Sequence, residues 1–277
     1  MVVFPNAKIN IGLDILRKRP DGYHDIVTVM APIPWTDVLE IVPSNGLNDT
    51  LTVSGREMKC APEQNLVMKA VKALRGKADF PIVDIFLYKI IPDGAGLGGG
   101  SADAAFTLKA LNEMFELNFS ADDLAAIAAG LGADCPFFIY NRPMICRGTG
   151  TEMATFNLNL PKGLTIVVVK PQVSVPTKEA YSAVLPAVPE VDLAERLSFV
   201  PFEEWQNVIA NDFEVSVFSK YPEIAEVKKQ LENMGAKYVA MSGSGSSVFG
   251  LFNDGDIMAD DVSSCFEGCD ILVKQMA

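Results

Sequence analysis

Histidine is almost absent from this 277-residue sequence, which has only His24. Zinc sites built on several histidines are therefore excluded, as is a protein-kinase His-Arg-Asp loop combined with any second role for histidine. A Ser-His-Asp triad would have to use His24, and no Gly-x-Ser-x-Gly turn is present to carry its nucleophile. We expect the chemistry to rest on carboxylates, lysines, backbone amides or bound ions.

Cysteine is also scarce. An odd, scattered set in a chain of this length predicts reduced thiols in a cytoplasmic protein. The one close pair lacks a neighbouring histidine or a second pair, which argues against a zinc site. The five residues are Cys60, Cys135, Cys146, Cys265 and Cys269.

Long apolar runs and an excess of basic residues are missing too. No run reaches the roughly 18 residues of a membrane span, and the first residues, MVVFPNAKIN, lack the pattern of a secretory signal. Lys and Arg number 23 against 35 Asp and Glu, a net charge of −12. This balance argues against nucleic-acid and membrane-surface partners, which need a basic face.

What is present predicts a packed α+β protein. Hydrophobic residues make up 49% of the chain, and the length allows two domains or one large one. Strand-like and helix-like segments alternate without a regular βαβ repeat, which favours α+β. We place the boundary near the Pro161-Lys162-Gly163 break, giving domains 1–157 and 158–277.

A glycine-rich loop is the most informative motif. Residues 92–101, PDGAGLGGGS, lie between an expected strand (82–91) and an expected helix (about 101–115), and five of the seven residues from 94 to 100 are glycine. Without Cβ atoms, backbone N–H groups can converge on a ligand. The helix would direct its unpaired N–H groups and its dipole into the same place. We expect a polyphosphate site; the alternative is a structural bend, which the entropy cost of ordering five glycines disfavours.

Other nucleotide motifs fit this loop poorly. Gly94 to Gly99 matches Gly-x-Gly-x-x-Gly, but a dinucleotide fold needs a second strand ending in an acidic residue about 20 positions on. The segment 112–133 has the pattern of helix and loop instead. No lysine follows the glycines as in a Walker A loop, and no valine stands two places after Gly99 as in protein kinases. A nicotinamide-dependent oxidoreductase stays as an alternative that a cofactor-binding measurement would test.

Four blocks resemble the GHMP family of small-molecule kinases, in the family's order. They are AKINIGL (7–13) followed by RPDGYH (19–24), the glycine block (92–105), LGADCPFF (131–138) and MSGSGSSVFG (241–250). The match spans nearly the whole chain. The glycine and last blocks are general to the family, whereas Gly-Tyr-His and Gly-Ala-Asp point to the branch acting on a cytidyl diphosphate of a sugar alcohol in the non-mevalonate isoprenoid route.

The resemblance implies a fold, a reaction and two cofactors. The fold would have an N-terminal α/β ATP-binding domain and a C-terminal ferredoxin-like α+β domain, with the active site between them. The reaction would use ATP and Mg²⁺ to phosphorylate the substrate's 2-hydroxyl. The partners would be these small molecules, and the protein a monomer or weak homodimer.

Two catalytic residues are implied. Asp134 would accept the proton of the attacking hydroxyl, a task for which a positioned carboxylate suffices; otherwise it caps a turn. Lys8 would lie beside Asp134 and the transferred phosphoryl group, whose charge it would stabilise; otherwise it is a surface lysine at a strand end.

The same resemblance implies binding residues. ATP would contact Pro92, Asp93, Gly94, Ala95, Gly96, Leu97, Gly98, Gly99, Gly100, Ser101 and Ala102, with Asn65 and Lys89 at the adenosine. The cytidyl substrate would contact Asn10, Tyr23, His24, Thr177, Tyr181, Gly243, Ser244 and Gly245, with Tyr181 stacking on the base. The family usually has a second serine where this chain has Ala102, so the metal ligands stay unassigned.

Two alternatives share this fold. One is another GHMP kinase, acting on homoserine, mevalonate or a sugar; Tyr23, His24 and Tyr181 argue against it, because those acceptors carry no cytosine. The other is a non-catalytic nucleotide-binding regulator, which would have no need to keep both Lys8 and Asp134.

Overall fold

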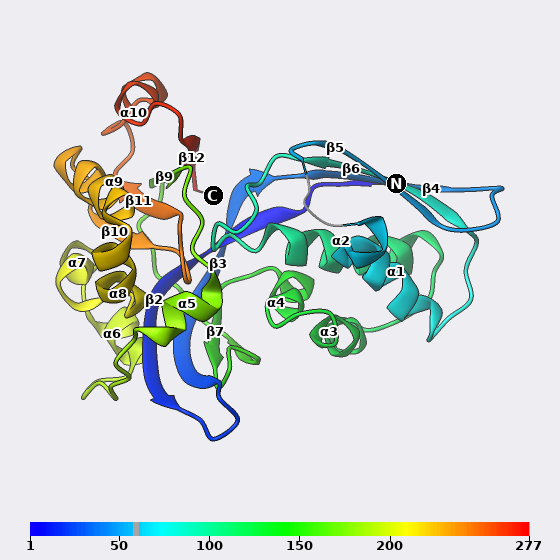
Figure 1. Ribbon diagram of the computed structural model, residues 1–277, viewed down its shortest axis with the longest axis horizontal. Coiled ribbons are helices and arrows are strands. Elements are labelled where there is room, and N and C mark those ends of the chain that lie inside the picture. The colour runs from blue at the N-terminus through cyan, green and yellow to red at the C-terminus, as the bar shows by residue number, and fades with distance from the viewer. Residues whose placement is uncertain (58–60, 277) are drawn as a thin grey trace. The chain divides into compact units, whose positions relative to one another are not determined.

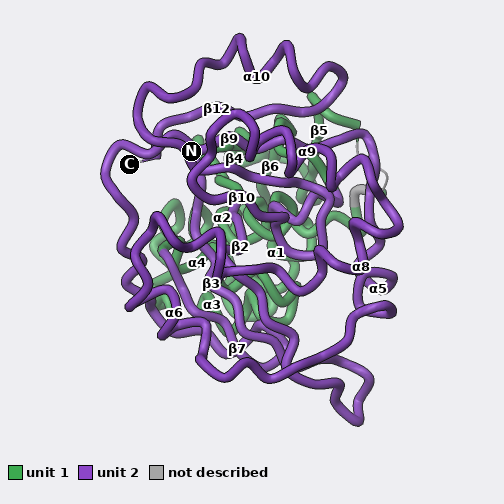
Figure 2. Tube along the Cα trace, turned by 90° about the vertical axis from the view of Figure 1, so that its left-hand side faces the viewer, with its two compact units in different colours: residues 1–7, 35–93, 98–142 green, residues 8–34, 94–97, 143–277 purple. Residues whose placement is uncertain are grey.

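The computed structural model describes residues 1–57 and 61–276, so Cys60 lies outside the described residues. The chain forms two compact units (Figure 2). Unit 1 comprises residues 1–7, 35–93 and 98–142, and unit 2 comprises residues 8–34, 94–97 and 143–277. The units are interleaved along the chain. The single boundary between residues 157 and 158 describes contiguous domains and stays a prediction.

Unit 1 is a four-stranded sheet with helices on one face (Figure 1). The strand order is β1 (Val2–Val3), β4 (Val38–Pro43), β6 (Val83–Lys89) and β5 (Thr50–Gly55), and only the β5–β6 pair is parallel. Alternate residues of β6 are buried, and the intervening Phe86 and Tyr88 are exposed. The helical elements are η1 (Pro62–Gln64), α1 (Leu66–Arg75), α2 (Gly99–Met114), α3 (Ala121–Ala129) and α4 (Cys135–Tyr140). Contacts of α1 with β5 and of α2 with β4 cover the buried face.

Unit 2 contains most of a second sheet. Its order is β2 (Asn6–Lys18), β3 (His24–Thr36), β7 (Met144–Arg147) and β8 (Glu152–Thr155). Strand β2 is buried from Ala7 to Ile15 and becomes exposed toward Lys18, where a turn leads into β3. The long buried strand is the element that carries Lys8 and Asn10.

The C-terminal part of unit 2 has a third, fully antiparallel sheet. Its order is β10 (Tyr238–Met241), β11 (Val248–Phe252), β9 (Thr165–Lys170) and β12 (Asp270–Gln275). In chain order these strands stand as 2-3-1-4, with helices between the first and second and between the third and fourth. This is the split βαβ arrangement of ferredoxin-like domains, which confirms that expectation.

Helices in unit 2 pack on this sheet through an apolar core. Helix α9 contacts β10 and β11, and its Ile224, Val227 and Leu231, spaced at three and four residues, are buried against the sheet. The helical elements are α5 (Thr177–Ser182), α6 (Leu193–Phe199), η2 (Phe202–Glu204), α7 (Trp205–Val208), α8 (Phe213–Lys220), α9 (Pro222–Asn233) and α10 (Ala259–Cys265). None of the helices in the described residues is long and apolar enough to cross a membrane.

Candidate active site

Lys8 and Asn10 lie on one face of β2, because side chains two residues apart in a strand point the same way. Both are buried, at 3% and 2% exposure. Nζ of Lys8 donates to Oδ1 of Asn10 at 2.6 Å and to the carbonyl oxygen of Gly96 at 2.8 Å. Nδ2 of Asn10 donates to Oγ1 of Thr28 on β3 at 3.0 Å. A buried ammonium group requires such acceptors, and these direct the charge of Lys8 to the glycine-rich loop.

The glycine-rich loop is hydrogen-bonded to a second loop, residues 242–247 between β10 and β11, which we call the serine-glycine loop. Oγ of Ser242 donates to the carbonyl oxygen of Gly96 at 2.9 Å and accepts from the N–H of Asn10 at 3.3 Å. Gly96 has φ +74°, and a Cβ there would lie 2.0 Å from the carbonyl oxygen of Ser242. The two loops can approach this closely only because residue 96 is glycine.

The tip of the serine-glycine loop lies near the lysine. A Cβ on Gly243, whose φ is +56°, would lie 3.6 Å from Nζ of Lys8. Oγ of Ser244 lies 3.2 Å from Oγ1 of Thr177 at the start of α5. Unit 2 therefore brings together Lys8 and the serine-glycine loop, and it sets Thr177 beside Ser244. Their contact with the substrate stays a prediction.

Helix α2 begins at the end of the glycine-rich loop. Its N-cap residue, Gly98, is left-handed (φ +72°) and offers no side chain to the first N–H groups of a 16-residue helix. Those groups and the helix dipole favour an anion at this end. Ala102 is fully buried, and its N–H donates to the carbonyl oxygen of Gly98. A contact between Ala102 and phosphate stays a prediction.

Asp134 stands at the N-cap position of α4 and is half-buried. Its carboxylate makes no capping hydrogen bond to α4. The next residue, Cys135, is buried, and burial raises the pKa of its thiol, while a hydrogen bond with Ser101 acts in the opposite direction. Ser101, in the first turn of α2, thus contacts the segment that carries Asp134. The expected pairing of Asp134 with Lys8 stays a prediction.

The two residues expected at adenosine have internal partners. Asn65 is the N-cap of α1, where its Oδ1 accepts from the N–H of Val67 at 2.9 Å. Lys89 is 1% exposed, and its Nζ lies 2.5 Å from Oδ2 of Asp37 and 2.8 Å from Oδ2 of Asp103. Asn65 is thus a helix cap, and Lys89 belongs to a buried triad of charged groups. A contact of either side chain with adenosine stays a prediction, and the burial of both side chains argues against it.

The buried triad has one more negative than positive group when both carboxylates are ionised. Burial raises the pKa of Asp103, and the charge of Lys89 lowers it by a smaller amount, so that the pKa is about 7. Burial lowers the pKa of Lys89, but the two aspartates outweigh this and raise it. Asp37 and Asp103 were not identified from the sequence as partners of Lys89. The signal that was available is the alternation along β6, which places Lys89 on the buried face, where an ammonium group needs a carboxylate.

His24 and Tyr181, both expected at the nucleoside, stack on each other. Their ring centroids are 4.9 Å apart and the ring planes differ by 18°. The edge-to-face contact between Tyr181 and Phe213 of α8 has a centroid distance of 4.7 Å. Burial, with the nearby charge of Lys18, lowers the pKa of His24. Since the stacked rings leave no space between them, a base would have to use another aromatic face, and Tyr23 is 67% exposed.

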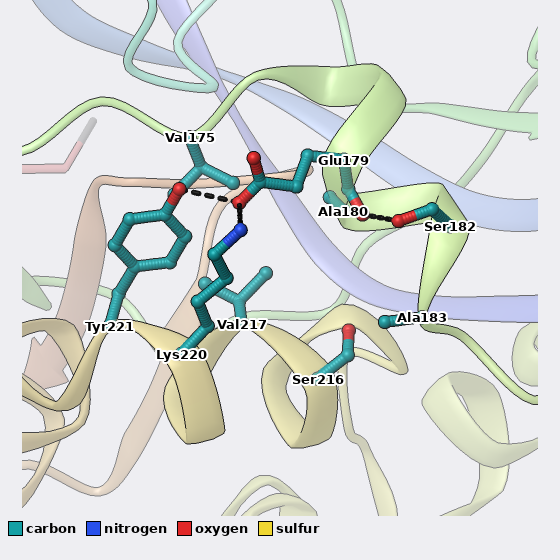
Figure 3. A pocket seen from close by; sticks show the side chains of 9 residues that line it. All are labelled: Val175, Glu179, Ala180, Ser182, Ala183, Ser216, Val217, Lys220 and Tyr221. Carbon is teal, nitrogen blue, oxygen red and sulfur yellow. Dashed lines mark hydrogen bonds and ion pairs between the residues drawn. The ribbon is translucent and has the colours of Figure 1, made fainter.

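Helix α5, which carries Thr177 and Tyr181, is bound to the C-terminal end of α8 by side-chain contacts that surround a small pocket (Figure 3). Oε1 of Glu179 accepts from Oη of Tyr221 at 2.5 Å and from Nζ of Lys220 at 2.7 Å. The pocket volume is about 120 Å³, well below the roughly 300–1,000 Å³ of ordinary ligand sites. We interpret it as the packing junction of the two helices. Six residues are too few for an independently stable helix, so these contacts determine where α5 lies.

Candidate metal ligands are few. Across residues 1–57 and 61–276, no group of three or more His, Cys, Asp or Glu side chains is arranged to hold a metal ion. An Mg²⁺ ion bound with a nucleotide takes many of its ligands from phosphate and water, so this donor set is compatible with metal that arrives with ATP.

Comparisons with known proteins point to one family. The family model described as "GHMP kinases N terminal domain" matches residues 65–142, and "GHMP kinases C terminal" matches residues 191–267. A protein of Bacteroides fragilis is 52% identical over 255 residues, covering 91% of this chain and 92% of its own. One of Parabacteroides distasonis is 51% identical over 252 residues, with the same coverage. Both are named 4-diphosphocytidyl-2-C-methyl-D-erythritol kinase.

A solved structure extends the likeness to three dimensions. It is a crystal structure of 4-(cytidine 5'-diphospho)-2C-methyl-D-erythritol kinase, 32% identical, with a TM-score of 0.81 and coverage of 99% of this chain and 98% of that one. The two-domain α+β fold and the family that the four sequence blocks indicate are both confirmed. The chain belongs to the GHMP kinase family.

Proposed function

We propose that this protein transfers the γ-phosphoryl group of ATP to the 2-hydroxyl of 4-diphosphocytidyl-2-C-methyl-D-erythritol. Its place in the GHMP kinase family makes it an ATP-dependent phosphotransferase. The observation that carries the proposal is the buried Lys8 ammonium group, held between the glycine-rich and serine-glycine loops. The names of the relatives support the choice of substrate. A cytoplasmic location and a monomeric or weakly dimeric state belong to the same proposal.

In this proposal the backbone holds the triphosphate. The N–H groups of the glycine-rich loop and of the first turn of α2 donate to its oxygens. Lys8 contributes its charge where the γ-phosphoryl group is transferred. At about 4 Å and an effective dielectric constant near 20, one such pair interacts by about 4 kcal/mol. Because Lys8 is already fixed by Asn10 and Gly96, little reorganisation accompanies the reaction.

Asp134 is the proposed general base. The substrate oxygen bonds to the γ-phosphorus as the bond to the β–γ bridging oxygen breaks, and ADP leaves with that electron pair. The hydroxyl proton passes to the carboxylate of Asp134. Asp134 is half-buried at the start of α4, and a carboxylate is a suitable acceptor for that proton.

Magnesium belongs to the proposal as the companion of ATP. When bound, it neutralises phosphate charge and assists departure of the ADP oxygen. Ser101 is the hydroxyl at the end of the glycine-rich loop that can join the phosphates in holding it, since Ala102 offers none.

The nucleoside end is assigned to the aromatic residues of unit 2. The lowered pKa of His24 keeps its ring neutral near pH 7, so one ring nitrogen donates and the other accepts. One of these nitrogens can bond to the edge of a cytosine. Tyr23 and Tyr181 supply faces for stacking, and the neighbouring hydroxyls of Thr177 and Ser244 suit the diphosphate.

An ADP-release assay tests the proposal. The protein receives Mg-ATP with 4-diphosphocytidyl-2-C-methyl-D-erythritol, homoserine, mevalonate or galactose, one at a time. Release with the cytidyl acceptor alone is the expected result. Turnover of another acceptor would refute the substrate assignment, and ATP binding without turnover of any acceptor would favour a regulator.

Variants then test the chemistry. Lys8→Met and Asp134→Asn should each lower kcat about 100-fold or more. Lys162→Met and Asp254→Asn make the same chemical changes at exposed positions and should match the unaltered protein. Near-normal turnover in folded Lys8→Met or Asp134→Asn would refute the assigned roles.

A further inference from the structure

Asn211, between α7 and α8, is a buried amide fully engaged with loop backbone. It is 2% exposed. Its Nδ2 donates to the carbonyl oxygens of Met241 at 2.7 Å and Gly243 at 2.8 Å, and its Oδ1 accepts from the N–H of Phe213 at 3.0 Å. Because two carbonyl groups can only accept, the orientation of the amide is unambiguous. Both N–H groups of the side chain thus donate to backbone: one to Gly243 in the serine-glycine loop, and one to Met241, the residue before that loop.

The backbone around Asn211 is fixed to the strand that carries Lys8. Residue 211 bridges Leu13 of β2; the N–H of Leu13 donates to the carbonyl oxygen of Ala210, and the N–H of Asp212 donates to that of Leu13, both at 2.9 Å. Oδ2 of Asp212 accepts from the N–H of Ile15 at 2.6 Å. Asn211 is therefore a direct link between β2 and the serine-glycine loop.

Glu214 completes the hold on the loop entry. Its Oε1 accepts from the N–H of Met241 at 2.8 Å, and its Oε2 accepts from Nζ of Lys228 at 2.6 Å. Both peptide groups of Met241 are thus bound by side chains at the start of α8. The loop that begins at Ser242 leaves the sheet from a fixed point.

The bond to Gly243 also determines a direction at the loop tip. The peptide bond between Gly243 and Ser244 is trans, so its N–H points opposite to its C=O. Since that C=O points to Asn211, the N–H of Ser244 points away from Asn211. A loop without this bond could turn the peptide over.

We propose that Asn211 is a positioning residue that aims the Ser244 N–H at a phosphate of the substrate. The inference rests on the proposed function, in which the serine-glycine loop binds the cytidyl diphosphate. Asn211 itself touches no ligand; it acts through the loop backbone.

The test variant is Asn211→Asp. It preserves shape and the acceptor for Phe213, but it replaces two donors with an oxygen that repels the carbonyl groups of Met241 and Gly243. The KM for the cytidyl substrate should rise about tenfold or more, and the KM for ATP should change less than about twofold. Asn207→Asp makes the same change at an exposed position of α7 and should leave both unchanged.

Two further measurements separate positioning from stability. Asn211→Ser keeps an acceptor for Phe213 without added charge and should show the same selective rise in KM if Asn211→Asp fails to fold. Amide exchange in folded protein should become faster at Ser242, Gly245 and Ser247, whose N–H groups are bonded in the native loop.

Each outcome decides the inference. Equal changes in both KM values, or a loss of folded protein at unchanged KM, would mean a merely structural role and overturn it. Unchanged KM values in folded Asn211→Asp would also overturn it. If the unaltered protein does not turn over the cytidyl substrate, the proposed function fails instead, and amide exchange alone then decides whether Asn211 orders the loop.

Discussion

Replacing Gly96 by alanine should disable the site through a single steric contact. The added Cβ would lie 2.0 Å from the carbonyl oxygen of Ser242, and real Cβ atoms essentially never approach closer than 3.0 Å. The loops must therefore separate by 3.0 − 2.0 = 1.0 Å or more. That movement acts on the same peptide whose oxygen accepts from Lys8.

Two costs can be separated. Alanine at the positive φ of residue 96 costs about 1–2 kcal/mol, and overpacking of this kind costs about 1–3 kcal/mol more. For catalysis, displacing reacting groups by about 1 Å lowers the rate about 100-fold. We expect kcat/KM for ADP release to fall by about that factor in protein that remains folded.

Gly255→Ala is the matched control. Its φ of +77° is close to the +74° of Gly96, but nothing lies within 4 Å of the added Cβ. This variant carries the backbone cost alone, so its kcat/KM should stay within about twofold of the unaltered protein. Urea unfolding of both variants measures the stability difference due to the contact. If Gly96→Ala and Gly255→Ala have equal kcat/KM, the close approach of the loops is irrelevant to the reaction and the reasoning is refuted.

Three further predictions concern other parts of the molecule. Tyr181→Ala should raise the KM for the cytidyl substrate about fivefold to 100-fold, as loss of base stacking implies, and spare that for ATP; equal rises would contradict stacking. Tyr221→Phe removes the donor to Glu179 and should raise the same KM about two- to tenfold by loosening α5; an unchanged KM would contradict the anchoring role. The pKa of Asp103 is raised from 3.8 to about 7, so the stability it contributes is full below pH 4 and is lost as pH rises through 7. The free energy of unfolding, measured with urea, should therefore decrease between pH 5 and pH 8 in the unaltered protein and decrease less in Asp103→Asn. An equal decrease in both proteins would show that Asp103 does not take up a proton on folding next to Lys89.

Local sequence was sufficient for the secondary structure near the site. The glycines of residues 94–100 mark the loop before α2, and the apolar spacing after it places the helix within two residues of its observed start at Gly99. Ser120 and Asp123, three residues apart, form a capping box at the start of α3. Lys8 and Asn10 share a face because a strand has a two-residue period. These features depend on interactions between residues close in sequence, so patterns in the sequence reveal them.

Pairings between distant residues were beyond such patterns. Lys89 was expected at adenosine, yet it pairs with Asp37, 52 residues away. His24 and Tyr181 were each expected at the nucleoside, but their stacking on each other was not foreseen. Composition and spacing identify the residue types, but the partner of a buried charge or ring depends on which elements pack together.

By itself, then, the sequence determined the α+β class, the family and the position of the glycine-rich loop, because glycine content, periodicity and residue order are local properties. Tertiary structure alone decided that Gly96 meets Ser242, that Asn211 holds Gly243, and that the compact units are interleaved along the chain. The reason is physical: these contacts arise when strands and loops far apart in the chain close together, and each is stable only as part of that packing.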